Sequence, residues 1–157
     1  MKINTKFFGE LEVNESDLIH FEDGLPGFKE YTKFLFISDE VANKDDKIVK
    51  KSPFSWLQSV DNQDIAFVLF DVFAFMPDYS PIINIEFLSM LGTDTLDDVK
   101  ICCIANIPSD IKKMSINLKA PIVINTNNNK AKQIICDNDN YSLKHYIYQE
   151  EVSKEQE

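Results

Sequence analysis

The stretch that decides the fold is residues 53–79, PFSWLQSVDNQDIAFVLFDVFAFMPDY. The side chains of Phe54–Val60 follow the two-residue period of a β-strand. Asp61–Asp64 supplies turn chemistry, because Asn and Asp side chains hydrogen-bond their own backbone and tolerate left-handed conformations. Ile65–Phe70 is apolar on both faces, which is typical of a strand in the middle of a sheet. Seven aromatic side chains without an accompanying catalytic constellation favour a surface built for contact.

Strand periodicity recurs on both sides of this stretch. Apolar side chains fall mostly on odd numbers from Ile3 to Val13, which predicts one long half-buried strand with a bend or bulge at Gly9. The asparagines at 127–129 predict the tip of a hairpin. The other expected strands or extended segments are Asp17–Phe21, Lys33–Ile37, Tyr79–Ile83, Val99–Ala105, Met114–Leu118, Ile122–Thr126, Ala131–Cys136 and Tyr141–Tyr148.

One helix is expected, over residues 84–91. Asn84 is a favourable N-cap, and Gly92 stands where a glycine ends many helices. Ile85, Leu88 and Leu91 are spaced three apart and are expected to share its apolar face.

Two polar or glycine-rich segments are expected between strands. Glu22–Phe28, EDGLPGF, predicts a tight, rigid turn that displays Leu25 and Phe28. Asp39–Ser52 has mixed charges and predicts a solvated loop.

A chain of 157 residues is expected to form one domain, which buries about 70% of the surface that the unfolded chain exposes. The fold class that follows is mainly β: a small single-domain, antiparallel β-barrel-like fold with one short helix near residues 84–91. The domain is expected to span residues 1–148, and residues 149–157 are expected to be a frayed acidic tail.

The charge of the chain argues against nucleic acid as a direct partner. The net charge is −10, and the basic residues are sixteen lysines with no arginine. Nucleic-acid binding depends on cationic neutralisation of phosphates, and arginine is the preferred fork for phosphate and guanine. An acidic surface attracts basic partners and repels polyanions, although acidity also serves solubility alone.

The sequence contains no recognisable catalytic or metal-binding motif. The three cysteines show no C-x-x-C spacing, and Cys102 and Cys103 are expected on opposite faces of a strand, so we expect buried, reduced thiols. His20 and His145 are far apart in the sequence, and His20 is expected to be a packed or surface residue. No enzyme activity and no cofactor are expected. The chain start, MKINTKFFGE, lacks the apolar core of a signal peptide, and no apolar run is long enough for a bilayer. We expect a cytoplasmic protein without membrane contact.

A set of linked motifs resembles the flagellar assembly factor family FliW. They run in order across residues 2–148, which makes the set more specific than any single piece. The matching segments are Phe7-x-Gly9, Phe21-x-x-Gly24-Leu25-Pro26-Gly27-Phe28, Pro53-Phe54-x-Trp56-Leu57-Gln58-Ser59-x-Asp61, Phe67, Phe75, Pro77-Asp78-Tyr79, Ile107-Pro108, Asn117-Leu118-x-Ala120-Pro121-Ile122-x-Ile124-Asn125 and Gln133. The chain departs from the family pattern in two places: the 39–52 loop is longer than expected, and Asp71-Val72 stands where a proline often follows in the family.

The resemblance implies a non-enzymatic binding protein with two alternative partners. These are cytoplasmic flagellin and the RNA-binding translational repressor CsrA. Free FliW sequesters the repressor, and flagellin occupies FliW when it accumulates, so the released repressor shuts flagellin translation down. The free protein is expected to be a monomer. The alternative interpretation of the residues is a small-ligand-binding β-barrel.

The candidate partner-binding residues come from the matching motifs. They are Pro26, Phe28, Gln58, Ser59, Asp78, Tyr79, Asn117, Lys119 and Pro121. Two alternatives stay open from the sequence. Gln58 and Ser59 either meet a partner or satisfy buried backbone at a turn, and Phe28 and Tyr79 either anchor an interface or belong to the core. Because flagellin ends in amphipathic helices, as its biology implies, a helix lying in an apolar groove is the expected binding mode.

Overall fold

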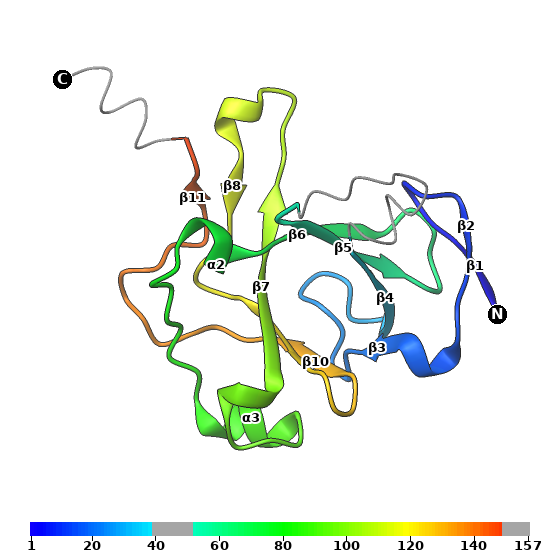
Figure 1. Cartoon of the computed structure of the whole chain (residues 1–157), viewed down its shortest axis with the longest axis horizontal. Coiled ribbons are helices and arrows are strands. Elements are labelled where there is room, and N and C mark those ends of the chain that lie inside the picture. Colours follow the sequence, from blue (N-terminus) through cyan, green and yellow to red (C-terminus); the bar gives the residue numbers. More distant parts are fainter. Residues whose placement is uncertain (39–51, 149–157) are drawn as a thin grey trace.

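The computed structural model describes residues 1–38 and 52–148 and is mainly β, as predicted (Figure 1). Seven strands close into a barrel in the order β7-β6-β5-β4-β3-β10-β9, and β9 pairs back onto β7. All of these pairings are antiparallel except β3–β10, where Lys130 pairs with His20 in parallel. The strands are β3 (Leu18–His20), β4 (Lys33–Ile37), β5 (Phe54–Ser59), β6 (Ala66–Phe70), β7 (Val99–Asn106), β9 (Ile122–Asn125) and β10 (Lys130–Gln133).

The hairpin β5–β6 confirms the prediction from the central stretch. Its register pairs Phe54 with Phe70 and Gln58 with Ala66. Asn62 forms the predicted Asx turn, since its side-chain oxygen accepts a hydrogen bond of 3.0 Å from the Asp64 backbone. The predicted strands around 33–37, 99–105 and 122–126 are also present, and β9 and β10 form the predicted hairpin. The strand predicted over 131–136 ends at Gln133.

The N-terminal segment is not the single long strand that its periodicity predicted. It forms a hairpin of β1 (Lys2–Asn4) and β2 (Glu10–Glu12), in which Ile3 pairs with Leu11. Gly9 has φ 69°, a conformation that glycine adopts without strain, and the Thr5 hydroxyl donates to its carbonyl at 2.7 Å. Ile3, Leu11 and Val13 pack inward from both sides of the hairpin, whereas Phe7 in its loop is 54% exposed and the even-numbered Phe8 packs inward instead.

The core is divided between the barrel interior and its outer surface. The interior is filled by a cluster that includes Phe21, Phe34, Leu57 and Leu69. The N-terminal hairpin covers one outer face, where Ile3 packs in a cluster with β4 side chains. A third cluster on the outside joins residues after β6 to the β7–β8 region, and a fourth lies under the helix α3.

The last strands extend the sheet beyond the barrel. The second half of β7 pairs with β8 (Ser115–Ile116), and β8 pairs with β11 (His145–Tyr146). Met114, Ile116 and Leu118 are all buried, but Ser115 between them is buried too, and only Ser115 and Ile116 form the ladder. Residues 79–83 contain no strand.

The predicted helix is α3 (Ile85–Met90), and the Asn84 side chain accepts a hydrogen bond from the Glu86 backbone at 2.9 Å. Ile85 is 60% exposed, which corrects its predicted place on the buried face. A second helix, α2 (Val72–Phe75), was not predicted, and Asp71 caps it by accepting from Phe73 N. Three 3-10 turns complete the described elements: η1 (Glu15–Asp17), η2 (Leu96–Asp98) and η3 (Ile111–Lys113).

The 22–28 turn is formed, but it displays only part of its apolar surface. Leu25 is buried in the barrel core, whereas Pro26 and Phe28 are exposed. The expectation that Leu25 would be displayed is therefore wrong, because its side chain is 2% exposed and packs with Phe21 and Phe34 in the barrel core. The predicted 39–52 loop, except Ser52, and the predicted tail 149–157 lie outside the described residues.

Candidate protein-binding surface

Gln58 and Ser59 lie inside the protein and are fully hydrogen-bonded. The Gln58 Nε2 donates to the carbonyls of Ser59 and Gln63 at 3.0 and 3.1 Å, and its Oε1 accepts from Lys6 N at 2.9 Å. The Ser59 Oγ accepts from Asn62 N at 3.1 Å. With exposed fractions of 1% and 0%, the two side chains satisfy backbone around a turn, which was the alternative interpretation of the sequence.

Tyr79 is a core residue that joins two of the candidate segments. It is 3% exposed, and its hydroxyl donates to the Leu118 carbonyl at 2.7 Å. Burial raises its pKa well above the usual tyrosine value, so the hydroxyl stays protonated and remains a donor. This hydrogen bond brings the exposed Asp78 close to the 117–119 segment.

The 117–121 segment is mostly turned inward. The Asn117 side-chain oxygen accepts from Ala120 N at 2.9 Å, and Lys119 Nζ donates to the Asn138 carbonyl at 2.6 Å. Both side chains are partly exposed. Pro121, a candidate partner-binding residue, is buried, and so is Ala120.

Phe28 is partly exposed and also packs on the barrel. Its ring is 36% exposed and meets Phe67 edge to face, with centroids 5.4 Å apart. Pro26 beside it is exposed. Of the nine candidates, Pro26, Phe28 and Asp78 are exposed and Asn117 and Lys119 are partly so. The structure joins the 78–79 and 117–119 segments in one cluster, whereas Phe28 packs on Phe67 beside another.

Sequence reasoning missed a group of exposed aliphatic side chains around α3, which we call the α3 surface. It consists of Ile82, Ile85, Met90 and Ile135, exposed by 58%, 60%, 58% and 66%. The segments that carry them are tied together, because Asp137 N donates to the Ile82 carbonyl at 2.9 Å. Their neighbours Leu91 and Ile134 are buried beneath the helix. The signal available in the sequence was the adjacent pair Ile134–Ile135, because neighbouring strand residues point to opposite faces.

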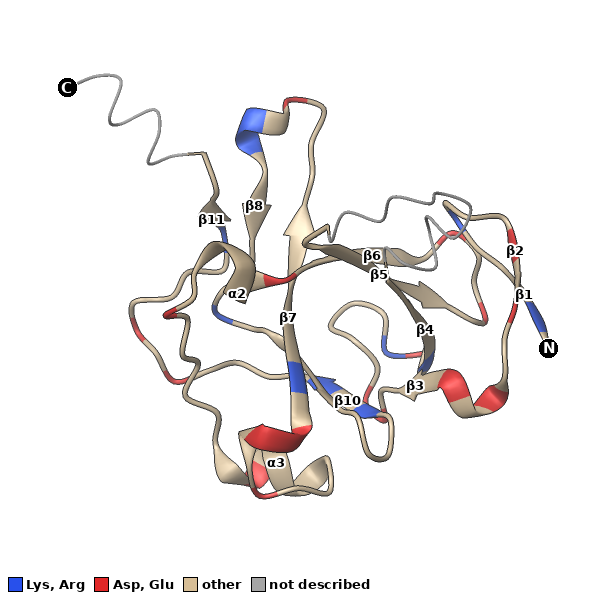
Figure 2. Cartoon of the chain, viewed as in Figure 1, with Lys and Arg blue, Asp and Glu red and all other residues tan. Residues whose placement is uncertain are grey.

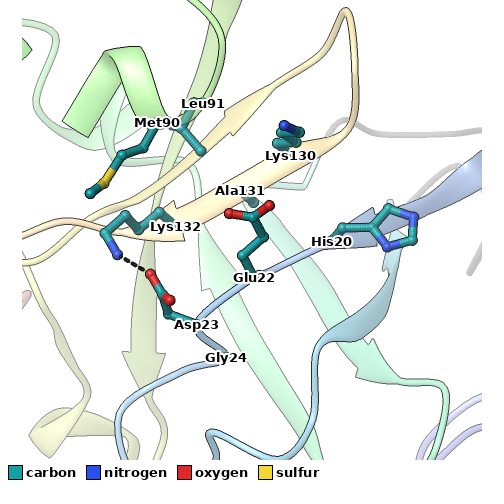
Figure 3. A pocket seen from close by; sticks show the side chains of 9 residues that line it. All are labelled: His20, Glu22, Asp23, Gly24, Met90, Leu91, Lys130, Ala131 and Lys132. Carbon is teal, nitrogen blue, oxygen red and sulfur yellow. Dashed lines mark hydrogen bonds and ion pairs between the residues drawn. The ribbon is translucent and has the colours of Figure 1, made fainter. Parts of the chain in front are cut away.

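A small cavity between β3, β10 and α3 is lined by two acidic and two basic residues, Glu22, Asp23, Lys130 and Lys132 (Figure 3). Its volume is about 150 Å³, below the range of about 300–1,000 Å³ that is usual for small-molecule sites. Lys132 Nζ lies 2.8 Å from the Asp23 carboxylate, and this hydrogen-bonded lysine lowers the pKa of the Asp23 carboxyl. This cavity is therefore too small for a typical small-molecule ligand, whereas a groove of about 560 Å³ between β2 and β4 lies within that range.

The described residues contain no cluster of three or more His, Cys, Asp or Glu side chains that could hold a metal ion. His20 was expected to be a packed or a surface residue, and it is exposed. Neither helix in residues 1–38 and 52–148 has the length and hydropathy that crossing a bilayer requires.

The three cysteines are free and buried, as predicted. Cys102 faces the barrel interior and Cys103 the outer cluster, so the adjacent side chains point to opposite faces. Burial raises the pKa of each of these two thiols to about 12.

We expect these thiols to make the protein lose stability at alkaline pH. The pKa is about 9 in the unfolded chain and about 12 in the folded one, so the thiols favour folding fully below pH 9. Between pH 9 and 12 the unfolded chain ionises first, and the free energy of unfolding falls by several kcal/mol. Urea unfolding at pH 7, 9 and 10.5 measures this, and the Cys102→Ala/Cys103→Ala variant should show a smaller fall. An equal fall in both proteins would contradict the assignment.

Comparisons with known proteins agree over almost the whole chain. A family model described as FliW protein matches residues 2–147. A flagellar assembly factor FliW of Thermoanaerobacter pseudethanolicus is 47% identical over 150 residues, covering 96% of this chain and 95% of that protein. Another flagellar assembly factor FliW, from Alkaliphilus metalliredigens, is 43% identical over 157 residues, and the match covers 100% of this chain and 91% of that protein.

A solved structure resembles the barrel described above. It is a crystal structure of the flagellar assembly factor FliW, with a TM-score of 0.82 and 34% sequence identity. The similarity covers 94% of this chain and 97% of the other. The match of fold, motif order and sequence over this length shows that the chain belongs to the FliW family.

Proposed function

We propose that this protein is a cytoplasmic flagellar assembly factor that binds flagellin and, alternatively, the translational repressor CsrA. The observation that carries this proposal is the family match over residues 2–147, supported by relatives that are named flagellar assembly factors. The protein acts by binding, as a monomer when free, without catalysis and without a cofactor.

The two partners exclude one another in this proposal. Free protein holds the repressor and leaves flagellin mRNA open to translation. Newly made flagellin displaces the repressor, which then silences the message. The protein thereby reports the level of unassembled flagellin without itself contacting RNA, in keeping with its net charge of −10 and its lack of arginine.

The α3 surface suits an amphipathic helix of flagellin. Each of its four side chains is more than half exposed, and α3 is held on the barrel by a buried cluster that includes Leu91 and Ile134. A rigid support of this kind lets an apolar helix face bury surface without reorganising the barrel.

We expect that replacing an apolar side chain of this surface by a charged one weakens flagellin binding. Ile85→Asp and Ile135→Asp each place a charge where an apolar contact is expected, and should lower the affinity for flagellin about 10- to 100-fold. Isothermal titration calorimetry with purified flagellin measures the effect. Both side chains are at least 60% exposed, so the thermal unfolding midpoint should change little.

A matched control is Leu143→Asp. Leu143 is 66% exposed, as Ile135 is, but belongs to the segment before β11. Flagellin affinity should stay within about twofold of the wild type in this variant. Equal losses in all three variants, or none, would remove the α3 surface from the binding site.

The acidic surface gives the repressor complex a measurable salt dependence. Bound beside the RNA site of the repressor, the protein adds negative potential that opposes phosphates, and screening acts over about 8 Å at physiological ionic strength. At saturating protein, inhibition of RNA binding should weaken as salt is raised from low to high. Inhibition that does not change with salt would leave only a conformational effect on the repressor.

A further inference from the structure

Strand β2 has an open edge in the described part of the chain. Met1 and Val13 exchange backbone hydrogen bonds of 2.8 and 2.7 Å. In an antiparallel ladder, pairs that exchange hydrogen bonds alternate with pairs that exchange none. Leu11 therefore bonds to Ile3 of β1, whereas the backbone N–H and C=O groups of Glu10 and Glu12 point away from β1. Among the described strands, β2 pairs only with β1.

Among residues 1–38 and 52–148, no strand pairs with the end of β4 on the side that continues from β3. The β3–β4 pairing stops at Leu18 opposite Leu35. Val60 N donates to the Lys33 carbonyl at 3.0 Å, which places the hydrogen-bonded pairs between β4 and β5 at odd residue numbers. The backbone groups of Phe36 therefore face away from β5, beyond the point where β3 has ended.

A groove of about 560 Å³ lies between these two open segments. Leu35, Phe36 and Ile37 line it from β4, and Leu11 and Val13 line it from the N-terminal hairpin. Figure 1 shows β1 and β2 beside β4 at the end of the barrel that carries the N-terminus. The groove thus combines two stretches of strand backbone that no other described strand pairs with and a lining in which Leu11 and Phe36 are partly exposed.

The groove is bordered by acidic residues. Glu10, Glu12 and Asp17 line it, and no lysine is among its described lining residues. Figure 2 shows these acidic positions along β2 and the turn that follows it. Lys2 lies 3.7 Å from Glu10 and offsets one of these three carboxylates, so the border remains acidic.

We propose that this groove is a docking site for an extended, basic polypeptide segment, which adds as a strand along the edge of β2. Backbone hydrogen bonds to Glu10 and Glu12 supply affinity, as in other cases of strand addition. Alternate side chains of the segment face the partly exposed Leu11 and Phe36 and the acidic border. Charged residues on an edge strand discourage pairing with other chains. Because the charges here are all negative, a segment rich in lysine or arginine is not repelled.

This site is separate from the α3 surface and requires a different occupant. An amphipathic helix satisfies its own backbone and has no use for an open strand edge, whereas an extended basic segment does. The proposal holds for whichever basic polypeptide supplies the segment, and therefore does not depend on the identity of the partners proposed above.

A proline scan of the hairpin edges tests the proposal. The probe is the capped peptide acetyl-Lys-Val-Lys-Val-Lys-amide, titrated into the isotopically labelled full chain and followed by backbone amide NMR. The amides of Glu10, Glu12 and Phe36 should shift most. Glu12→Pro removes an N–H that β1 does not use, and should weaken peptide binding about tenfold while the hairpin is kept.

The matched control is Asn4→Pro. Asn4 lies directly opposite Glu10, and its N–H points to the far edge of β1, so the variant should bind the peptide as the wild type does. Equal weakening in both variants, or no amide shift with 1 mM peptide, would overturn the proposal. If Glu12→Pro does not fold, Glu10→Lys/Glu12→Lys replaces it, and should prefer acetyl-Glu-Val-Glu-Val-Glu-amide to the lysine peptide. An unchanged preference would also overturn the proposal.

Discussion

Replacing Gln58 by leucine is expected to lower the free energy of unfolding by about 3 kcal/mol. The leucine would leave the Lys6 N–H and the Gln63 carbonyl without the partners that the amide now supplies at 2.9 and 3.1 Å. These groups belong to the N-terminal hairpin loop and the β5–β6 turn, so the loss loosens two segments that are far apart in the sequence. Urea unfolding followed by tryptophan fluorescence measures the change.

Gln63→Leu is the control for this prediction. Gln63 is exposed and donates a single side-chain hydrogen bond of 3.3 Å, to the Thr5 carbonyl. Its replacement should cost less than about 1 kcal/mol. A Gln58→Leu protein as stable as the wild type, but impaired in partner binding, would return Gln58 to the interface.

Substituting alanine for Gly24 should destabilise the protein by about 3 kcal/mol or more. Gly24 has φ 63°, and a Cβ there would lie 2.6 Å from the backbone Cα of Lys29. The clash is with backbone, which cannot rotate away, and it lies next to Leu25 in the barrel core. The shift of the thermal unfolding midpoint gives the magnitude.

Gly27→Ala separates the two causes of this effect. Gly27 has φ 84°, but a Cβ there would meet nothing within 4 Å. Only the cost of the left-handed backbone remains, about 1–2 kcal/mol. If the two variants lost equal stability, the close approach to Lys29 would have no energetic weight.

The barrel strands were the part of the fold that local sequence could specify. In β5 and β6 the periodicity, the Asx turn and the hydrophobic run all agree, and the hairpin forms in the expected place. The N-terminal periodicity misled because a hairpin and a single strand can present the same residues inward. The Thr5–Gly9 turn, which decides between them, depends on contacts of Lys6 with Gln58 and of Gln63 with Thr5.

The candidate site was less accessible to sequence reasoning than the fold. Residues of a family motif are kept for stability as well as for binding, and Gln58, Tyr79 and Pro121 are buried. The exposed residues Ile82, Ile85 and Ile135 look like core residues by type. Their exposure follows from how α3 sits on β9 and β10, which no local pattern encodes. Open strand edges depend on which strands end first, and are likewise a property of the whole fold.

A competition titration tests directly whether flagellin displaces the repressor from this protein. Fluorescently labelled CsrA is first saturated with the protein, and unlabelled flagellin is then added while the anisotropy of CsrA is followed. Anisotropy should fall to the value of free CsrA as flagellin reaches stoichiometry with the protein. Stable association with neither partner, or a complex in which both remain bound together, would contradict it.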